Sequence, residues 1–156
     1  MSEVSPPPVP AALAGPELRL TRRAIALAVL LASMALLVVA DRLAPDPSGM
    51  GTHRQLGLPA CGWVDGFGLP CATCGMTTAF AAAADGDLAT AFVAQPFGAL
   101  LALATGVTAV VSAFVLLTGS AVGGLAVRLL TPRTAAVLGV LAVLAWIYKI
   151  VVVRSS

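Results

Sequence analysis

Charged residues are scarce in this chain of 156 residues. They make up 10% of it, whereas a soluble domain carries about 25%. Nine basic and seven acidic residues leave a net charge of +2, too small and too scattered for a nucleic-acid-binding stripe. The composition therefore excludes an ordinary soluble domain and gives no support to a nucleic-acid partner.

Catalytic motifs are absent as well. The sequence has no glycine-rich phosphate loop before a Lys-Ser or Lys-Thr pair, no HExxH, and no Ser with a His and Asp partner set. With one histidine in the whole chain, chemistries that need several imidazole ligands or a histidine base have little to work with. The sequence leans away from an enzyme.

Hydrophobic residues are abundant at 59%, and they gather in three runs that are long enough to cross a bilayer. The runs cover residues 24–40, 97–117 and 135–153, against about 17 to 25 residues for a spanning helix. Each must be helical, because unpaired backbone groups are too costly in hydrocarbon and three segments cannot close a barrel. Near the end of the third run we expect Lys149 to snorkel to the head groups, beside Trp146 and Tyr148 as an interfacial aromatic belt.

The N-terminal residues 1–21 are rich in proline and are expected to form a disordered cytoplasmic leader. The first run then has two interpretations. It is a retained helix with Ala24, Ala28 and Ala32 on a face that a neighbouring helix approaches, or a signal peptide cleaved after the small residues Val38 and Ala40. The remainder, residues 22–156, is expected to be one membrane domain.

The distribution of basic residues predicts the orientation. Arg19, Arg22 and Arg23 precede the first span, which by the positive-inside rule places the N-terminus in the cytoplasm. Segment 41–96 would then lie on the outer face of a bacterial inner membrane. It contains all three cysteines: Cys61, Cys71 and Cys74.

Within that segment, glycine and proline predict an irregular loop until about residue 72, followed by a helix from Thr73 to Ala84 that starts with the CxxC. A dozen helical residues rise about 18 Å, too little to span, so this helix is expected to be re-entrant or interfacial. Asp85 would end it, and Asp87 would cap a second short helix, Leu88 to Ala94, before Pro96 opens the next span.

The run CGWVDGFGLPCATCGMTTAFAAAADGDLATAFVAQPFGALLAL resembles a bacterial membrane family, domain of unknown function 2752, over about residues 58–105. Asp85 stands where many relatives have His, and Gln95 where they have Asn, so no His ligand is carried over to position 85. The resemblance implies a small integral membrane protein and brings no activity with it. The residues that carry the resemblance are Cys61, Gly68, Pro70, Cys71, Cys74, Gly75, Met76, Thr77, Gly86, Asp87, Gln95 and Pro96.

The three cysteines allow several kinds of chemistry. Three sulfurs with a water or His53 would complete a tetrahedral zinc site, and sulfur also suits copper as Cu(I). A structural cross-link would instead restrain the Gly- and Pro-rich loop, and a CxxC at a helix start favours a thiolate for thiol–disulfide exchange through Cys71 and Cys74.

The sequence thus predicts an all-α membrane protein with three spanning helices and one short re-entrant or interfacial helix, in contact with the lipid bilayer. The leading hypothesis is an outer-face three-cysteine site that binds a thiophilic metal, zinc or copper, or forms a structural cross-link. The alternatives are a thiol–disulfide relay and a scaffold or transporter accessory with a membrane protein partner.

Overall fold

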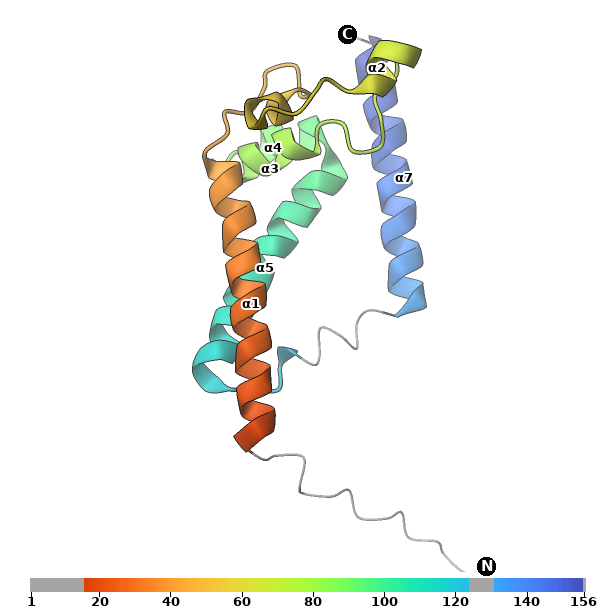
Figure 1. Cartoon of the computed structure of the whole chain (residues 1–156). Helices are drawn as coiled ribbons and strands as arrows, with labels where there is room; N and C mark the ends of the chain where they lie inside the picture. The colour runs from red at the N-terminus through yellow and green to blue at the C-terminus, as the bar shows by residue number, and fades with distance from the viewer. Residues whose placement is uncertain (1–15, 124–130, 156) are drawn as a thin grey trace, which may run out of the picture.

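The computed structural model describes residues 16–123 and 131–155, and all of its regular elements are helical (Figure 1). Three helices are long and apolar enough to cross a membrane: α1 (Pro16–Asp41), α5 (Pro96–Thr118) and α7 (Pro132–Ser155). The predicted all-α class with three spans is therefore confirmed. Each helix extends past its predicted apolar run, because helical geometry continues into the polar flanks.

The N-terminal boundary differs from the prediction. Helix α1 begins at Pro16, so it takes in residues 16–21, which we expected to belong to a disordered leader. Proline is suited to a first helical turn, because its missing N–H would have no partner there. The rest of that leader, residues 1–15, lies outside the described residues.

Helix α1 packs along α5 through small side chains spaced seven residues apart. Ala26, Ser33 and Ala40 are buried, and this spacing keeps one stripe of a helix facing its neighbour. The face with Ala24, Ala28 and Ala32 is exposed instead, so our expectation that a neighbouring helix packs there is wrong. Alanine occurs on both faces of α1, and only the packing of α1 against α5 shows which face is buried.

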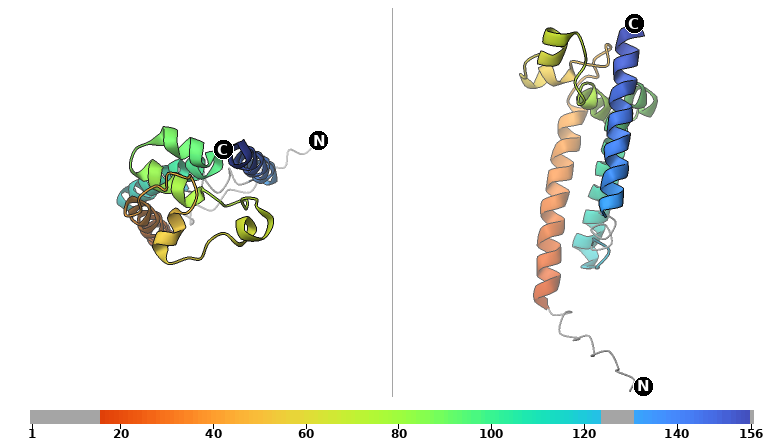
Figure 2. Two further views of the ribbon diagram at one scale, coloured as in Figure 1. Left: turned by 90° about the horizontal axis from the view of Figure 1, so that it is seen from above. Right: turned by 90° about the vertical axis from the view of Figure 1, so that its right-hand side faces the viewer.

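Between α1 and α5 the chain builds a cap of four short helices at one end of the long ones (Figures 1 and 2). They are η2 (Thr52–Leu56), α2 (Gly62–Phe67), α3 (Met76–Ala84) and α4 (Leu88–Ala94). The stretch before residue 72 is thus not the continuous loop we expected, because it contains two short helices: η2 lies between Gly51 and Gly57, and α2 ends at Gly68, three glycines with positive φ.

The start of α3 also differs from the prediction. This helix begins at Met76 rather than Thr73, because Gly75 takes a left-handed conformation with φ of 87° and interrupts the helix before it. The CxxC therefore lies in the turn that precedes α3. Alanine and glycine let α3 approach its neighbours closely: a Cβ at Gly98 of α5 would come within 3.1 Å of the Ala79 side chain.

The boundaries of α4 and α5 agree with the sequence prediction. The Asp87 carboxylate accepts a hydrogen bond of 2.9 Å from the Thr90 N–H and caps α4. The buried Gln95 side chain accepts from the Gly98 N–H and caps α5, with Pro96 in its first turn. Asp85 and Asp87 are accounted for as a helix end and a helix cap.

Helix α7 has few contacts with α5 and stands apart from α1 along most of its length (Figures 1 and 2). Its C-terminal end lies beside the cap. Lys149 is there 3% exposed, so the expectation that its side chain snorkels to the head groups is wrong. Carbonyl oxygens of the cap supply the polar partners that we had expected the head groups to provide.

Candidate functional site

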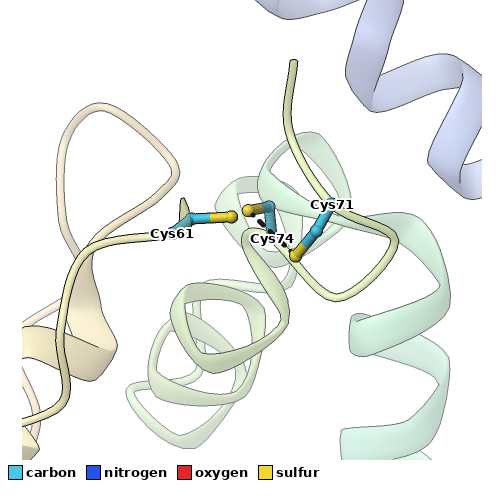
Figure 3. Close-up of side chains that lie close together, drawn as sticks. All are labelled: Cys61, Cys71 and Cys74. Carbon is cyan, nitrogen blue, oxygen red and sulfur yellow. Dashed lines mark hydrogen bonds between the residues drawn. The ribbon is translucent and has the colours of Figure 1, made fainter. Parts of the chain in front are cut away.

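The sulfur atoms of the three cysteines meet at one point of the cap. Cys61 directly precedes α2, and Cys71 and Cys74 lie in the turn before α3. The three Sγ atoms all lie within 4.8 Å of one another, and Figure 3 shows the side chains pointing together. The loop therefore returns Cys61 to the CxxC, as a shared sulfur site requires.

Two local features bring these residues together. The Cys74 N–H donates to the Cys71 carbonyl over 3.1 Å, which closes the turn and places both thiols on one side of it. The buried hydroxyls of Thr52 and Thr78 lie 2.9 Å apart and join η2 to α3. Because η2 leads into the arm that carries Cys61, this contact helps to hold that arm against α3.

All three cysteines are free thiols. The Cys71 and Cys74 sulfurs are 3.3 Å apart and hydrogen-bonded. That separation lies between the roughly 2.05 Å of a disulfide bond and the roughly 3.8 Å between two sulfurs that share a tetrahedral zinc ion with Zn–S bonds of 2.3 Å. A small adjustment of side chains leads from this arrangement to either state.

Two thiols of the cluster have pKa values shifted in opposite directions. Burial opposes ionisation of Cys61, but hydrogen bonds from the Cys74 thiol and from the Val64 and Cys71 N–H groups outweigh it and lower the pKa of Cys61 to about 6. Burial, followed by the hydrogen bonds to Cys61 and Cys71, raises the pKa of Cys74 to about 12. At neutral pH the cluster therefore contains a Cys61 thiolate and a Cys74 thiol.

This result changes the predicted origin of the thiolate. We expected the CxxC at a helix start to hold the acidic thiol, through free backbone N–H groups and the helix dipole. In the structure, Gly75 separates the CxxC from the first turn of α3. The thiol with the lowered pKa is instead Cys61, which receives hydrogen bonds from both neighbouring segments.

His53 lies near the cluster without joining it. Its Nε2 atom is 3.1 Å from the Pro59 carbonyl oxygen. The candidate group of ligand atoms within 4.8 Å, searched among the described residues, contains the three sulfurs and no His53 nitrogen. His53 does line a cavity of about 160 Å³ together with Cys61 and Cys74. Asp46, Arg54 and Asp65 also line this cavity, so charged residues surround an opening that reaches two of the three cysteines.

Helix α7 contributes residues that the sequence analysis did not assign to the site. The Trp146 indole N–H donates to the carbonyl of Pro70, the residue before Cys71, over 2.9 Å. The Lys149 ammonium donates to the carbonyls of Gly49 and Ala94 over 3.0 and 2.9 Å. One feature of the sequence could have indicated Lys149: it is an ionisable residue in an apolar span, and such residues often mark functional positions.

No curated protein and no solved structure matches the chain. A family does match, over residues 61–109, which begin at the first cysteine and end within α5. This segment contains all three cysteines, α3 and α4. The match bears out the sequence resemblance for this segment, and the family that the segment matches is described as "Protein of unknown function (DUF2752)".

Proposed function

We propose that this protein is an integral membrane component that binds a thiophilic metal ion, zinc or Cu(I), at Cys61, Cys71 and Cys74 on the outer face of the membrane. The observation that carries the proposal is the convergence of the three Sγ atoms within 4.8 Å. Two neighbouring cysteines meet readily in a tight turn, but the third comes from ten residues before the CxxC in a separate arm. A chain that gathers three sulfurs in this way has the ligand set that zinc and Cu(I) prefer.

The fourth coordination position is supported by the cavity. Structural zinc sites are closed by four protein ligands, whereas functional sites keep one position open. The cavity of about 160 Å³ reaches Cys61 and Cys74 and has charged residues in its lining, so water, a small ligand or a rotated His53 can complete a tetrahedron. Three protein sulfurs and an accessible fourth position suit a site that takes up and releases its ion.

The outer-face position rests on charge. Arg19, Arg22 and Arg23 lie near the end of α1 that is distant from the cap. If this end is cytoplasmic, as the positive-inside rule predicts, then α1 carries the cap to the opposite side. The sulfurs would then meet metal ions that arrive from outside the cell.

Thiol–disulfide exchange through Cys71 and Cys74 is the second candidate, favoured by their 3.3 Å separation. In that reaction the two thiols lose two protons and pass two electrons to a disulfide of a partner protein, which becomes a dithiol while a Cys71–Cys74 disulfide forms. The lowered pKa of Cys61 makes Cys61 the thiol best suited to attack the partner disulfide first. Cys71 then displaces the partner thiol from Cys61, and Cys74 displaces Cys61 from Cys71, which leaves the Cys71–Cys74 disulfide and restores the Cys61 thiol. A structural cross-link would use the same sulfurs without turnover.

Metal analysis of the purified, reduced full-length chain tests the proposal. We expect one zinc or copper ion per chain. The metal affinity should fall in each of the variants Cys61→Ser, Cys71→Ser and Cys74→Ser, and by more than the roughly 10–100-fold that follows the loss of a group which only orients a ligand. Cys→Ser variants that keep the wild-type helical content separate ligand loss from misfolding. His53→Ala tests the fourth ligand, because it weakens binding only if the histidine coordinates.

Two results would overturn the metal proposal. The first is a metal-free protein that also fails to bind added Zn²⁺ or Cu(I) under reducing conditions. The second is binding that survives all three Cys→Ser substitutions. A Cys71–Cys74 disulfide that forms and is reduced reversibly, in a protein without metal affinity, would support the exchange reaction instead.

A further inference from the structure

Two side chains near the end of α7 reach all three arms of the sulfur cluster. Trp146 donates to the Pro70 carbonyl beside Cys71, and its ring contacts the ring of Trp63, two residues after Cys61, in an edge-to-face pair with centroids 6.1 Å apart. The Lys149 side chain passes Gly75, the residue after Cys74, where a Cβ would lie 3.3 Å from its Cε atom. Each cysteine therefore has a sequence neighbour in contact with α7.

Lys149 is the only lysine of the chain and is almost fully buried. Burying an ammonium group is costly unless polar groups or charges compensate it. Two carbonyl oxygens accept its hydrogen bonds, and no carboxylate among the described residues forms an ion pair with it. Its buried charge is therefore held by two backbone carbonyls of the cap, which lie close to Gly75, the residue after Cys74.

These contacts matter more because α7 is otherwise loosely attached. Among the described helices it packs only sparsely against α5, so the polar contacts at its C-terminal end supply much of its attachment to the cap. The same end of α7 contacts residues next to or near each of the three cysteines.

We propose that Trp146 and Lys149 are positioning residues for the three-cysteine metal site, and that metal binding and the docking of α7 on the cap are thermodynamically linked. The inference rests on the proposed metal-binding function and adds a second element to it. If docked α7 favours the arrangement of sulfurs that binds metal, then bound metal must favour docked α7 by the same factor. Metal binding at the cap would in this way change how firmly a membrane-spanning helix docks on it.

Tyr148 provides a matched control. It lies between the two residues on α7, and its hydroxyl donates over 3.2 Å to the carbonyl of Val93 in α4. Val93 is not a sequence neighbour of any cysteine. Tyr148→Phe thus removes one hydrogen bond between α7 and the cap without touching an arm of the cluster. By contrast, Trp146→Phe removes the donor to the arm of Cys71, and Lys149→Met removes the ammonium that bonds to the two carbonyls packed around Gly75.

The test uses the full-length protein in detergent micelles with Co²⁺ and Zn²⁺ as probes. We expect Trp146→Phe and Lys149→Met to weaken Zn²⁺ binding by about 10–100-fold, as for other groups that orient metal ligands. We also expect them to shift the thiolate-to-cobalt absorption of the Co²⁺ form. Tyr148→Phe should leave both the affinity and the spectrum within about twofold of wild type. A purely structural role would not alter the cobalt spectrum selectively in the first two variants.

The linkage has its own readout, because the chain contains two tryptophans. In protein labelled with fluorotryptophan, Zn²⁺ should shift and sharpen the Trp146 resonance, which a Trp63→Phe variant identifies. No change on saturation with Zn²⁺ would contradict the linkage. If Lys149→Met fails to fold, Trp146→Phe decides the positioning role alone, since it keeps an aromatic ring in a smaller side chain and removes the N–H donor.

The outcomes also separate this inference from the proposed function. If the wild type binds one metal that depends on the cysteines, while Trp146→Phe and Lys149→Met bind it with unchanged affinity and spectrum, the positioning role is wrong and the metal site stands. If the wild type binds no metal, both proposals fail together. If Tyr148→Phe weakens binding as much as the other two, general docking of α7 rather than positioning of the cluster arms explains the effect, and the inference is overturned.

Discussion

The hydroxyl oxygens of Thr52 and Thr78 lie 2.9 Å apart and are both buried. Thr52 Oγ1 also accepts a hydrogen bond of 2.9 Å from the Asp46 N–H. This short chain of hydrogen bonds joins the segment after α1 to η2 and to α3. It is one reason that the arm bearing Cys61 lies beside the CxxC.

We expect Thr78→Val to lower the free energy of unfolding by about 1–2 kcal/mol, because the buried hydroxyl of Thr52 loses one of its two hydrogen-bond partners and keeps only the Asp46 N–H. Thr52→Val should cost more, since it also leaves the Asp46 N–H without its acceptor. Denaturant titration of the protein in mixed micelles, followed by circular dichroism, measures both. Thr108→Val is the control: this exposed hydroxyl bonds only within α5, and its loss should cost less than about 0.5 kcal/mol. Strictly additive losses in the Thr52→Val, Thr78→Val double variant would show that the two side chains do not interact.

The pKa values of the cluster predict a pH profile for alkylation. Only the thiolate reacts, and the pKa of Cys61 is lowered to about 6 while that of Cys74 is raised to about 12. In metal-free protein, iodoacetamide should therefore modify Cys61 first, with a rate that falls as the pH drops through about 6, and Cys74 should stay protected at neutral pH. Peptide mass spectrometry at a series of pH values follows each site.

The same profile has an internal control. Cys74→Ala removes the thiol that donates to the Cys61 thiolate, so the pKa of Cys61 should rise and its alkylation midpoint should move to higher pH. An unchanged midpoint, or equal reactivity of Cys61 and Cys74 at pH about 7, would contradict the conclusion that the Cys74 thiol stabilises a Cys61 thiolate.

Gly75 predicts a steric effect next to the site. An alanine there has to adopt φ of 87°, at a cost of about 1–2 kcal/mol, and its Cβ would come within 2.8 and 2.9 Å of the Gly49 and Ala94 carbonyl oxygens. Those oxygens are the two acceptors of Lys149, so Gly75→Ala should lower thermal stability and metal affinity together.

Gly86→Ala separates the two causes. Gly86 has a similar φ of 83° with nothing within 4 Å of an added Cβ, so this variant carries the backbone strain without the clash. Its melting temperature should fall less than that of Gly75→Ala, and its metal affinity should be unchanged. Equal effects of the two substitutions would mean that the contacts around Gly75 do not matter.

Sidedness is tested with the native cysteines. If the cap faces outward, a membrane-impermeant maleimide should label Cys61 in intact cells, since its thiol lines the open cavity. A Cys61→Ser variant measures the background. Labelling that appears only after lysis would place the cap in the cytoplasm and reverse the proposed orientation.

Prediction from the sequence succeeded where a local rule decides the structure. The cap at Asp87 and the place of Pro96 in the first turn of α5 follow from residues within one helical turn, and the structure has α4 at Leu88–Ala94 as predicted. It was wrong where two local rules compete. The run of good helix formers and small residues from Thr73 to Ala84 suggested one continuous helix, but Gly75 interrupts it. The left-handed conformation of Gly75 is compatible with the close approach of two carbonyls, which leaves no room for a side chain.

The sequence by itself determined the three spanning helices and the presence of a cysteine-bearing segment between the first two. Long apolar runs in lipid have to satisfy their own backbone hydrogen bonds, and helices are the solution available to three segments. Only the tertiary structure decided that Cys61 holds the acidic thiol and that Lys149 lies buried beneath the cap. Both depend on contacts between residues far apart in the chain, up to 100 positions for Lys149 and Gly49, and no spacing within a single segment encodes such contacts.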